Sequence, residues 1–486
     1  MTNRQSHAPI AEAMATYAKD GALAFHTPGH KQGLGAHPLL RELITEQGLR
    51  EEVSLMEELD DLHDPSGCIR EAQDLAAELY GADAAWFMVN GTTGAIHSML
   101  LAALSPGDTV LVPRNAHRSM LGGILLVGAV PVFLQPAIDR GFGIPMGLPL
   151  ETVEQAIHSH PEAKALALVS PTYYGIASDL PALADLLHSR DMLLLVDEAH
   201  GAHLRFSDRL PVSAMDAGAD LAAQSTHKLL GALTQASLLL GRKGRVDFSR
   251  VQKAASLLQT TSPNYLLLAS LDIARLQMAT EGRERIERAI DLSHGLRRSI
   301  RELPGLSCLG PECVGTAGAA GLDPTKLTVS VRSLGISGLE AERILRHRCK
   351  IQCELSDPGN LLFILSMADT KQEANRLLDG LSYLSRRCHG KETPLPLPPP
   401  CPPALQRLSP REAFWAPTET VAVNKAAGRI SAEQISFYPP GIPVLCPGEE
   451  ISAERIRYIR ELQAMGCRVT GPADPTLQTI ETIPIA

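Results

Sequence analysis

Apolar and polar positions alternate in blocks through the middle of the chain. Short runs without polar alternation, such as Ala165–Ser170 and Leu193–Val196, are typical of strands buried on both faces of a sheet. Stretches with apolar residues at helical spacing separate them, including Leu150–Ser159 and Leu180–Ser189. A further helix is expected at Ala95–Leu104, and further strands at Ala85–Val89, Thr109–Val112, Val130–Leu134, Leu221–Gln224 and Ser237–Leu240. This alternation predicts an α/β fold with a mostly parallel, doubly wound sheet and right-handed crossovers.

The flanking segments predict additional domains. Residues 1–50 read as an arm with a helix, a His/Gly loop (Phe25–Gly35) and a second helix, and residues 68–80 as a helix ended by Gly81. A long helical stretch from 265 to Glu302 precedes short strands at Lys326–Val331 and Leu361–Leu365. The predicted division is an N-terminal arm or linker region (1–50), a large domain (51–300), a smaller α/β domain (301–392), a proline-rich linker (393–405) and a small C-terminal domain (406–486) with the turn-rich run Phe437–Pro443.

Composition narrows the class of protein. The 486 residues carry a net charge of −9 without a long basic run, so no nucleic-acid partner is expected. No signal peptide or long apolar span is visible, which predicts no membrane association. The nine cysteines are odd in number and form no CxxC pair, which favours reduced thiols and a cytoplasmic location.

Lys228 is the first candidate for chemistry. It lies in QSTHKL (224–229), directly after a predicted buried strand. A lysine at the carboxyl end of a strand and withdrawn from water has a lowered pKa, which makes it a nucleophile toward an aldehyde. A single lysine in a turn after a strand is more often a surface residue, so its neighbours decide the interpretation.

Three neighbours support that interpretation together. Asp197 ends the run MLLLVD, where a carboxylate could keep a pyridine nitrogen protonated, although it could instead cap a helix. The turn Gly91-Thr92-Thr93-Gly94 could bind a phosphate or start a helix, and His117 could stack on a ring or be an ordinary loop histidine. The order of Gly/Thr turn, histidine, aspartate and Ser-x-His-Lys is the layout of fold-type I pyridoxal-phosphate (PLP) enzymes.

Longer stretches narrow the resemblance. The chain resembles the Orn/Lys/Arg decarboxylase family of bacterial arginine and lysine decarboxylases, and the pair HTPGHK and YPPGIP is specific to it. It resembles the short members without an N-terminal wing, so the decamers that use this wing are not expected. The matching stretches are AFHTPGHKQG (24–33), DDLHDPSG (60–67), NGTTGA (90–95), RNAHRS (114–119), PTYYG (171–175), VDEAHGAH (196–203), STHK (225–228), TTSPNY (260–265), SPREAF (409–414) and YPPGIP with the following PGE (438–449).

The resemblance implies roles for individual residues. Lys228 is the Schiff-base lysine, Asp197 partners the pyridine nitrogen, and His117 stacks on the ring opposite Ala199. His200 stands where several family members carry an aromatic residue. The phosphate is bound near Gly91, Thr92, Thr93, Ser225 and His227, and by Thr261 and Ser262 of a neighbouring subunit. The last two imply a homodimer, or a higher homo-oligomer, with shared active sites.

The implied reaction is PLP-dependent decarboxylation of a basic L-amino acid to an amine, as in polyamine biosynthesis. Lys228 or His227 would return the proton to the substrate, and Glu354, with Asp357 nearby, would bind the distal cation. Glu354 could equally be a surface charge at a strand edge. Pocket depth decides the substrate, with arginine favoured slightly over lysine and then ornithine.

Two other functions stay open. The first is another fold-type I reaction, such as that of an aminotransferase or a lyase; the stretch 360–370 lacks the late arginine of an aspartate-type aminotransferase. The second is a catalytically silent PLP-fold regulatory protein. No metal site is expected, because Pro28 and Gly29 break the helix that ligation by His26 and His30 would need. The HTPGHK loop is expected to shape the active-site entrance.

Overall fold

The structure, a computed structural model, describes residues 3–388, 394–438 and 441–484. Its contacts divide the chain into two compact units. The first comprises Met1–Ala103, Leu195–Ser207 and Val212–Glu284, and the second comprises Leu104–Leu194, Asp208–Pro211 and Arg285–Ala486. Each unit is described separately.

The first unit begins with short helices. Where one second helix was predicted, the chain forms two, because Ile44 is extended and Thr45 caps a new helix with its hydroxyl. The predicted helix at 68–80 is confirmed as α4, and Gly81 ends it in the left-handed conformation, with φ 68°. The helices here are α1 (Pro9–Asp20), α2 (Pro38–Leu43), α3 (Glu46–Glu51) and α4 (Cys68–Tyr80), with 3-10 turns at Asn3–Ser6 and Glu57–Leu59.

Two predicted helix boundaries in this unit are wrong. Helix α5 begins at Gly91 rather than Ala95, since the Gly/Thr segment forms its first turn, where backbone N–H groups have no partner within the helix. The long helix predicted from 265 breaks at Glu281, which is followed by the poor helix former Gly282. The remaining elements are β1 (Ala84–Met88), α5 (Gly91–Ala103), a 3-10 turn at Leu204–Phe206, β9 (Leu221–Gln224), α9 (Thr226–Leu229), β10 (Ser237–Gly241), α10 (Phe248–Leu258), α11 (Tyr265–Thr280) and α12 (Gly282–Arg301), of which only the first three residues belong to this unit.

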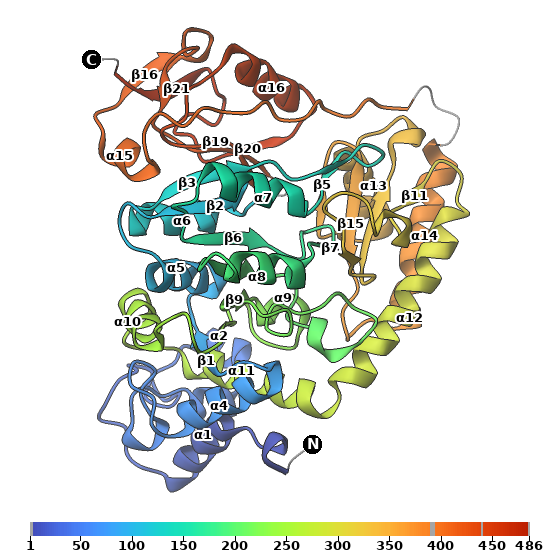
Figure 1. The fold of residues 1–486 in the computed structure, drawn as a ribbon. Coiled ribbons are helices and arrows are strands. Elements are labelled where there is room, and N and C mark those ends of the chain that lie inside the picture. Colours follow the sequence, from blue (N-terminus) through green and yellow to red (C-terminus); the bar gives the residue numbers. More distant parts are fainter. Residues whose placement is uncertain (1–2, 389–393, 439–440, 485–486) are drawn as a thin grey trace. The chain divides into compact units, whose positions relative to one another are not determined.

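The main sheet has seven strands in the order β1-β10-β9-β8-β6-β2-β3 (Figure 1). Strand β2 is parallel to β3 and β6, and β8 is parallel to β9. Strand β10 is antiparallel to both β1 and β9. The predicted mostly parallel α/β sheet is therefore confirmed. Strands β8 and β9 are almost wholly buried, which explains their apolar sequences.

The second unit contains the remaining strands and helices of the α/β pattern. The predicted Val130–Leu134 strand and Leu150–Ser159 helix have the predicted bounds. Helix α6, for which we made no prediction, follows β2 directly. The elements are β2 (Thr109–Pro113), α6 (Arg118–Val127), β3 (Val130–Leu134), β4 (Ile138–Asp139), β5 (Ile144–Pro145), α7 (Leu150–Ser159), β6 (Ala165–Val169), β7 (Ile176–Ala177), α8 (Leu180–His188) and β8 (Leu193–Asp197), whose last three residues belong to the first unit.

A four-stranded antiparallel sheet in the order β11-β13-β15-β14 follows in the second unit. Leu381 and Leu384 of α14 share one hydrophobic core with Leu361 and Phe363 of β15. The elements are β11 (Ser307–Cys308), β12 (Gly321–Leu322), β13 (Lys326–Ser330), α13 (Gly338–Ile344), a π-helical turn at Leu345–Cys349, β14 (Leu355–Ser356), β15 (Asn360–Ile364) and α14 (Lys371–Cys388), with 3-10 turns at Pro311–Cys313 and Arg332–Leu334.

The C-terminal segment of the second unit has its own core, built on two three-stranded sheets and α16. Residues 394–404 before it form neither helix nor strand, as their prolines predict. Pro439 and Pro440 of YPPGIP lie outside the described residues. The elements are α15 (Pro410–Trp415), β16 (Glu419–Ala422), a 3-10 turn at Val423–Lys425, β17 (Ile430–Ser431), β18 (Ile435–Tyr438), β19 (Ile442–Leu445), α16 (Ala453–Ala464), β20 (Arg468–Thr470) and β21 (Thr479–Ile483).

Within the described ranges, no helix is long and apolar enough to cross a membrane. All nine cysteines lie in these ranges, and no disulfide joins any two of them there.

Candidate active site

Lys228 lies on the one-turn helix α9, directly after the buried strand β9. Its side chain is half-buried, and its Nζ lies 3.0 Å from Nε2 of His200. It is also close enough to Asp197 to favour the ionised form of that carboxyl group. The short helix therefore directs the lysine into a cluster of buried polar groups.

Asp197 is the last residue of β8, and only 2% of it is exposed. Burial raises the pKa of its carboxyl group, while the charge of Lys228 and a 3.1 Å hydrogen bond from the Ala199 N–H oppose that rise. Two carboxylate oxygens can accept about four hydrogen bonds. This carboxylate can therefore accept a further bond from a cationic N–H group, as a protonated pyridine nitrogen would require.

Thr92 and Ser225 are brought together although 133 positions separate them. The Thr92 hydroxyl bonds to the hydroxyl of Ser225 and, at 2.7 Å, to that of Ser237. Thr92 lies in the first turn of α5, next to Gly91, whose φ is +67°. A helix N-terminus beside hydroxyl groups suits a phosphate, so this arrangement fits the cofactor that the sequence predicted. The Thr93 side chain is exposed in the same turn.

His227 precedes Lys228 on α9 and is half-buried. Its Nδ1 lies 2.9 Å from the carbonyl oxygen of Ala236. Because a carbonyl can only accept, Nδ1 carries the proton and Nε2 of the neutral ring keeps its lone pair. Ala199, two residues after Asp197, is buried.

Two acid–base residues of this cluster were missed or left unassigned from the sequence. His200 is 2% exposed and contacts the candidate lysine directly. Glu198 is fully buried and accepts 2.7 Å hydrogen bonds from Ala214 N–H and Gln224 Nε2. Burial raises the pKa of the Glu198 carboxyl group to about 8. The segment DEAHGAH, directly after a buried strand, was the available signal for both.

Thr261 and Ser262 lie in the segment between α10 and α11, and both are exposed. The Ser262 N–H donates to the hydroxyl of Thr260 at 3.1 Å, which shapes a local turn. Their contact with a neighbouring subunit stays a prediction.

His117 belongs to the second unit, where it caps α6 after β2. Its Nδ1 accepts a hydrogen bond of 3.3 Å from the Ser119 N–H and lies 2.8 Å from the Ser119 hydroxyl. The ring orientation is therefore set by the start of the helix. Its stacking on a cofactor bound at Lys228 stays a prediction.

The two acidic residues considered for the substrate differ sharply. Glu354 precedes β14 with its side chain exposed, and its N–H donates to Leu362 O at 2.9 Å. Asp357 is buried and accepts 2.8 Å hydrogen bonds from Tyr174 OH and from the N–H groups of Gly359 and Asn360. Asp357 therefore stabilises a turn, and Glu354 is the one of the two that is accessible to a ligand.

The two histidines of the HTPGHK loop have separate partners. Nε2 of His30 lies 2.7 Å from Glu52 Oε2, and Nε2 of His26 lies 3.1 Å from Tyr17 OH. Over the described ranges, no group of three or more His, Cys, Asp or Glu side chains could hold a metal ion. The peptide bond between Thr27 and Pro28 is cis.

Comparison with known proteins identifies the family. The model of the Orn/Lys/Arg decarboxylase major domain matches residues 8–373, and that of the family's C-terminal domain matches residues 404–475. The chain is 46% identical to an arginine decarboxylase of Halalkalibacterium halodurans, over 99% of this chain and 98% of the relative. It is 45% identical to an arginine decarboxylase of Bacillus subtilis, with the same coverage.

A solved structure supports the same fold. The lysine decarboxylase LdcF of Francisella novicida superposes with a TM-score of 0.85 at 23% identity, covering 98% of this chain and 81% of that one. The fold-type I architecture predicted from the sequence is thereby confirmed. The chain belongs to the Orn/Lys/Arg decarboxylase family, whose members are PLP-dependent amino-acid decarboxylases.

Proposed function

We propose that this protein decarboxylates arginine to the corresponding primary amine and CO2, with PLP as cofactor. One observation carries the proposal: Lys228 Nζ lies close to Asp197 and His200 in a buried cluster after β9. The chain that contains this cluster is about as long as the arginine decarboxylases it matches. A lysine in such a setting is suited to attack on an aldehyde.

The residues of the first unit offer a binding group for each part of PLP. The first turn of α5 and the hydroxyls of Thr92 and Ser225 would hold the phosphate, with Gly91, Thr93 and His227 nearby. Asp197 would accept the N–H of the pyridinium ring, and Ala199 would lie against one face of the ring. When bound, PLP supplies an electron sink for the pair released when CO2 leaves.

Proton transfer falls to the chain's own residues. Lys228 Nζ is the first candidate to return a proton to the substrate, because it is half-buried and placed to contact the cofactor. His227 is the second candidate: because Ala236 O holds one proton of the ring on Nδ1, its Nε2 would first accept a proton and then return it to the substrate. His200 Nε2 can exchange a proton with Lys228 at 3.0 Å. His117 would stack on the ring, as the family resemblance implies.

Glu354 is proposed to bind the distal cation of the substrate, because its carboxylate is exposed while that of Asp357 is not free. The variant Glu354→Gln should raise KM for arginine about tenfold, at an unchanged kcat, because it removes one charge-assisted hydrogen bond. Steady-state kinetics with arginine and lysine would measure this. Unchanged KM values for both substrates would remove Glu354 from the site.

The decisive experiment is a side-by-side assay of the purified protein with PLP on arginine, lysine and ornithine. We expect CO2 and amine from all productive substrates, and the highest kcat/KM for arginine. Formation of a keto acid without CO2 would favour an aminotransferase instead. No product from any basic amino acid would favour a regulatory protein without catalytic activity.

We also propose a homodimer or a higher homo-oligomer with shared active sites. Large apolar side chains are exposed in the N-terminal arm, where Leu23, Phe25, Leu34 and Leu43 are each more than four-fifths exposed. Such exposed apolar side chains within a stretch of about twenty residues could be covered by a second subunit. Thr261 and Ser262 are also exposed, as contact with a neighbouring subunit's phosphate would require. Analytical ultracentrifugation of the purified protein tests the assembly.

A cytoplasmic role in polyamine biosynthesis fits a basic amine as the product. Nine cysteines without a disulfide among the described residues suit a reducing compartment.

A further inference from the structure

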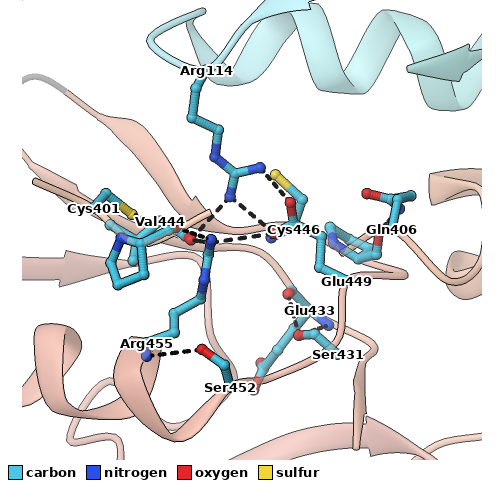
Figure 2. Close-up of polar contacts among 12 residues, drawn as sticks. Arg114, Cys401, Gln406, Ser431, Glu433, Val444, Cys446, Glu449, Ser452 and Arg455 are labelled. Atoms are coloured by element: carbon cyan, nitrogen blue, oxygen red, sulfur yellow. Dashed lines mark hydrogen bonds and ion pairs between the residues drawn. The ribbon is translucent and has the colours of Figure 1, made fainter. Parts of the chain in front are cut away.

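Arg114 forms a buried ion pair with the C-terminal segment of the chain. It follows β2, three residues before His117, and only 7% of it is exposed. Its Nη2 donates to Glu449 Oε2 at 2.9 Å and its Nη1 donates to Oε1, so the pair is bidentate (Figure 2). Charge-assisted pairs with two parallel bonds define geometry as well as adding energy.

Glu449 is held firmly from its own side. It is 1% exposed, and its Oε2 accepts a 2.8 Å hydrogen bond from the Cys446 N–H and lies 3.5 Å from Nη1 of Arg455 (Figure 2). Arg114 also donates to the carbonyl oxygen of Val444 at 2.9 Å. The anchor for Arg114 is therefore a rigid part of the C-terminal core.

The loop between Arg114 and His117 is fixed at each step. The Arg114 N–H donates to Leu134 O at 2.7 Å, and its guanidinium lies 4.8 Å from the centre of the Phe133 ring. Asn115 donates from Nδ2 to Met146 O at 3.1 Å. His117 then caps α6 with its ring. Arg114 and the imidazole of His117 are therefore separated by only two residues of a hydrogen-bonded loop.

The same C-terminal segment also contacts the far end of α6. Arg411 of α15 donates to the carbonyl oxygen of Val127, the last residue of α6, at 3.2 Å. A Cβ atom at Gly128 would lie 2.7 Å from Nη1 of Arg411, so the Arg411 side chain packs directly against the backbone of Gly128. Residues from 410 onward thus contact the last residue of α6 and, through Arg114, the loop that leads into the helix.

We infer that Arg114 is a positioning residue: with Glu449, it lets the C-terminal segment set the orientation of His117 over the cofactor. The inference rests on the proposed function, because it takes the stacking role of His117 from there. A buried Arg–Glu–Arg cluster is a weak source of stability, since desolvation offsets much of the attraction. The bidentate pair between Arg114 and Glu449 fixes the orientation of the Arg114 side chain, which an apolar contact in its place could not do. This arrangement also accounts for residues that the catalytic assignment did not use, namely Arg114 of RNAHRS, Arg411 of SPREAF and Glu449 of PGE.

Two conservative variants test the inference. Arg114→Lys keeps the charge but loses the bidentate geometry, and Glu449→Gln keeps the shape but loses the charge. The matched control is Glu450→Gln, because the next residue along the chain forms an exposed pair with Arg407 at 2.7 Å. Hydrogen exchange of peptides covering residues 114–127 would be measured in the protein without PLP. The PLP dissociation constant, the visible circular dichroism of bound PLP, kcat and KM would be measured with the cofactor present.

In Arg114→Lys and Glu449→Gln we expect faster exchange in residues 114–127, an altered dichroism band and PLP binding weakened about tenfold. We expect kcat to fall about 10- to 100-fold with little change in KM, because small displacements of a positioning group are costly. Glu450→Gln should match the wild type in every measurement.

A folded Arg114→Lys protein with a lower melting temperature but wild-type exchange, PLP affinity and dichroism would overturn the inference. If both buried variants fail to fold, Arg411→Ala serves instead, since it removes one bond to α6 and leaves no buried charge unpaired. It should change exchange, PLP affinity and dichroism in the same direction, and wild-type values would overturn the inference. A His117→Ala protein with normal PLP affinity and kcat would instead refute the stacking role, and with it the proposed function of His117.

Discussion

Two buried aspartates, one in each unit, show how differently this protein uses the same side chain. Burial raises the pKa of both Asp197 and Asp357. Asp357 accepts hydrogen bonds from Tyr174 OH, from two backbone N–H groups and from Asn360 Nδ2. Asp197 accepts one backbone N–H and faces the charge of Lys228.

The difference separates structure from function. A buried carboxylate whose acceptor sites are filled by its own chain stabilises that chain, and it has no capacity left for a ligand. A buried carboxylate with unfilled sites beside a reactive lysine keeps its capacity for a bound group. Neighbouring sequence did not distinguish the two, because each aspartate lies at the end of a short buried strand or directly after one.

The largest effect should come from removing Lys228, whose positive charge faces Asp197. Lys228→Ala should lower kcat about 10⁴-fold or more, because the cofactor loses its covalent attachment and the reaction loses its proton donor. The visible absorbance of lysine-bound PLP should disappear. The exposed Lys425→Ala variant is the control. Full activity in Lys228→Ala would refute the assignment.

Asp197→Asn should lower kcat/KM for arginine about 10²- to 10³-fold, because an amide cannot stabilise a protonated pyridine nitrogen as a carboxylate does. The melting temperature of the protein without PLP should change little, since Asn can still accept the Ala199 N–H. Enzyme kinetics and thermal unfolding measure the two effects. A large loss of stability with normal kinetics would mean that Asp197, like Asp357, stabilises the fold and does not bind the cofactor.

Asp357→Asn should show the opposite behaviour. Its amide group would face the Nδ2 group of Asn360, which can only donate, so the free energy of unfolding should fall by about 2 kcal/mol. The kcat/KM of the folded variant should remain at the wild-type level. Chemical denaturation and kinetics would be compared on one preparation. A raised KM for arginine at unchanged stability would assign Asp357 to the substrate site.

The smallest effect concerns pH and Glu198, next to Asp197. Burial raises the pKa of Glu198 from its ordinary value of 4.5 to about 8, so the fold favours the protonated form. The stabilisation of the fold by protonated Glu198 is fully present below the ordinary pKa of 4.5, and it is lost as the pH rises through the raised pKa of about 8. The melting temperature should therefore fall by a few degrees between about pH 5 and about pH 8. Glu198→Gln should reduce that fall, and an equal fall in both proteins would contradict the buried, protonated carboxyl.

The sequence by itself determined the local elements and the family. Three elements have their predicted bounds: Val130–Leu134, Leu150–Ser159 and Leu221–Gln224. Burial of a whole strand, as in Leu221–Gln224, or of one helical stripe, as in Leu150–Ser159, leaves a direct pattern in neighbouring residues. The order of the Gly/Thr turn, His117, Asp197 and Lys228 pointed to the enzyme class, and the comparisons confirm the family.

Only the tertiary structure decided which partners these residues have. The reversed direction of β10, the contact between His200 and Lys228, and the filled acceptor sites of Asp357 all depend on residues brought from elsewhere in the chain. Arg114 and Glu449 are 335 positions apart, and no local pattern links them. Side-chain periodicity records whether a position is buried, whereas a buried charge depends on the particular group that packing places beside it.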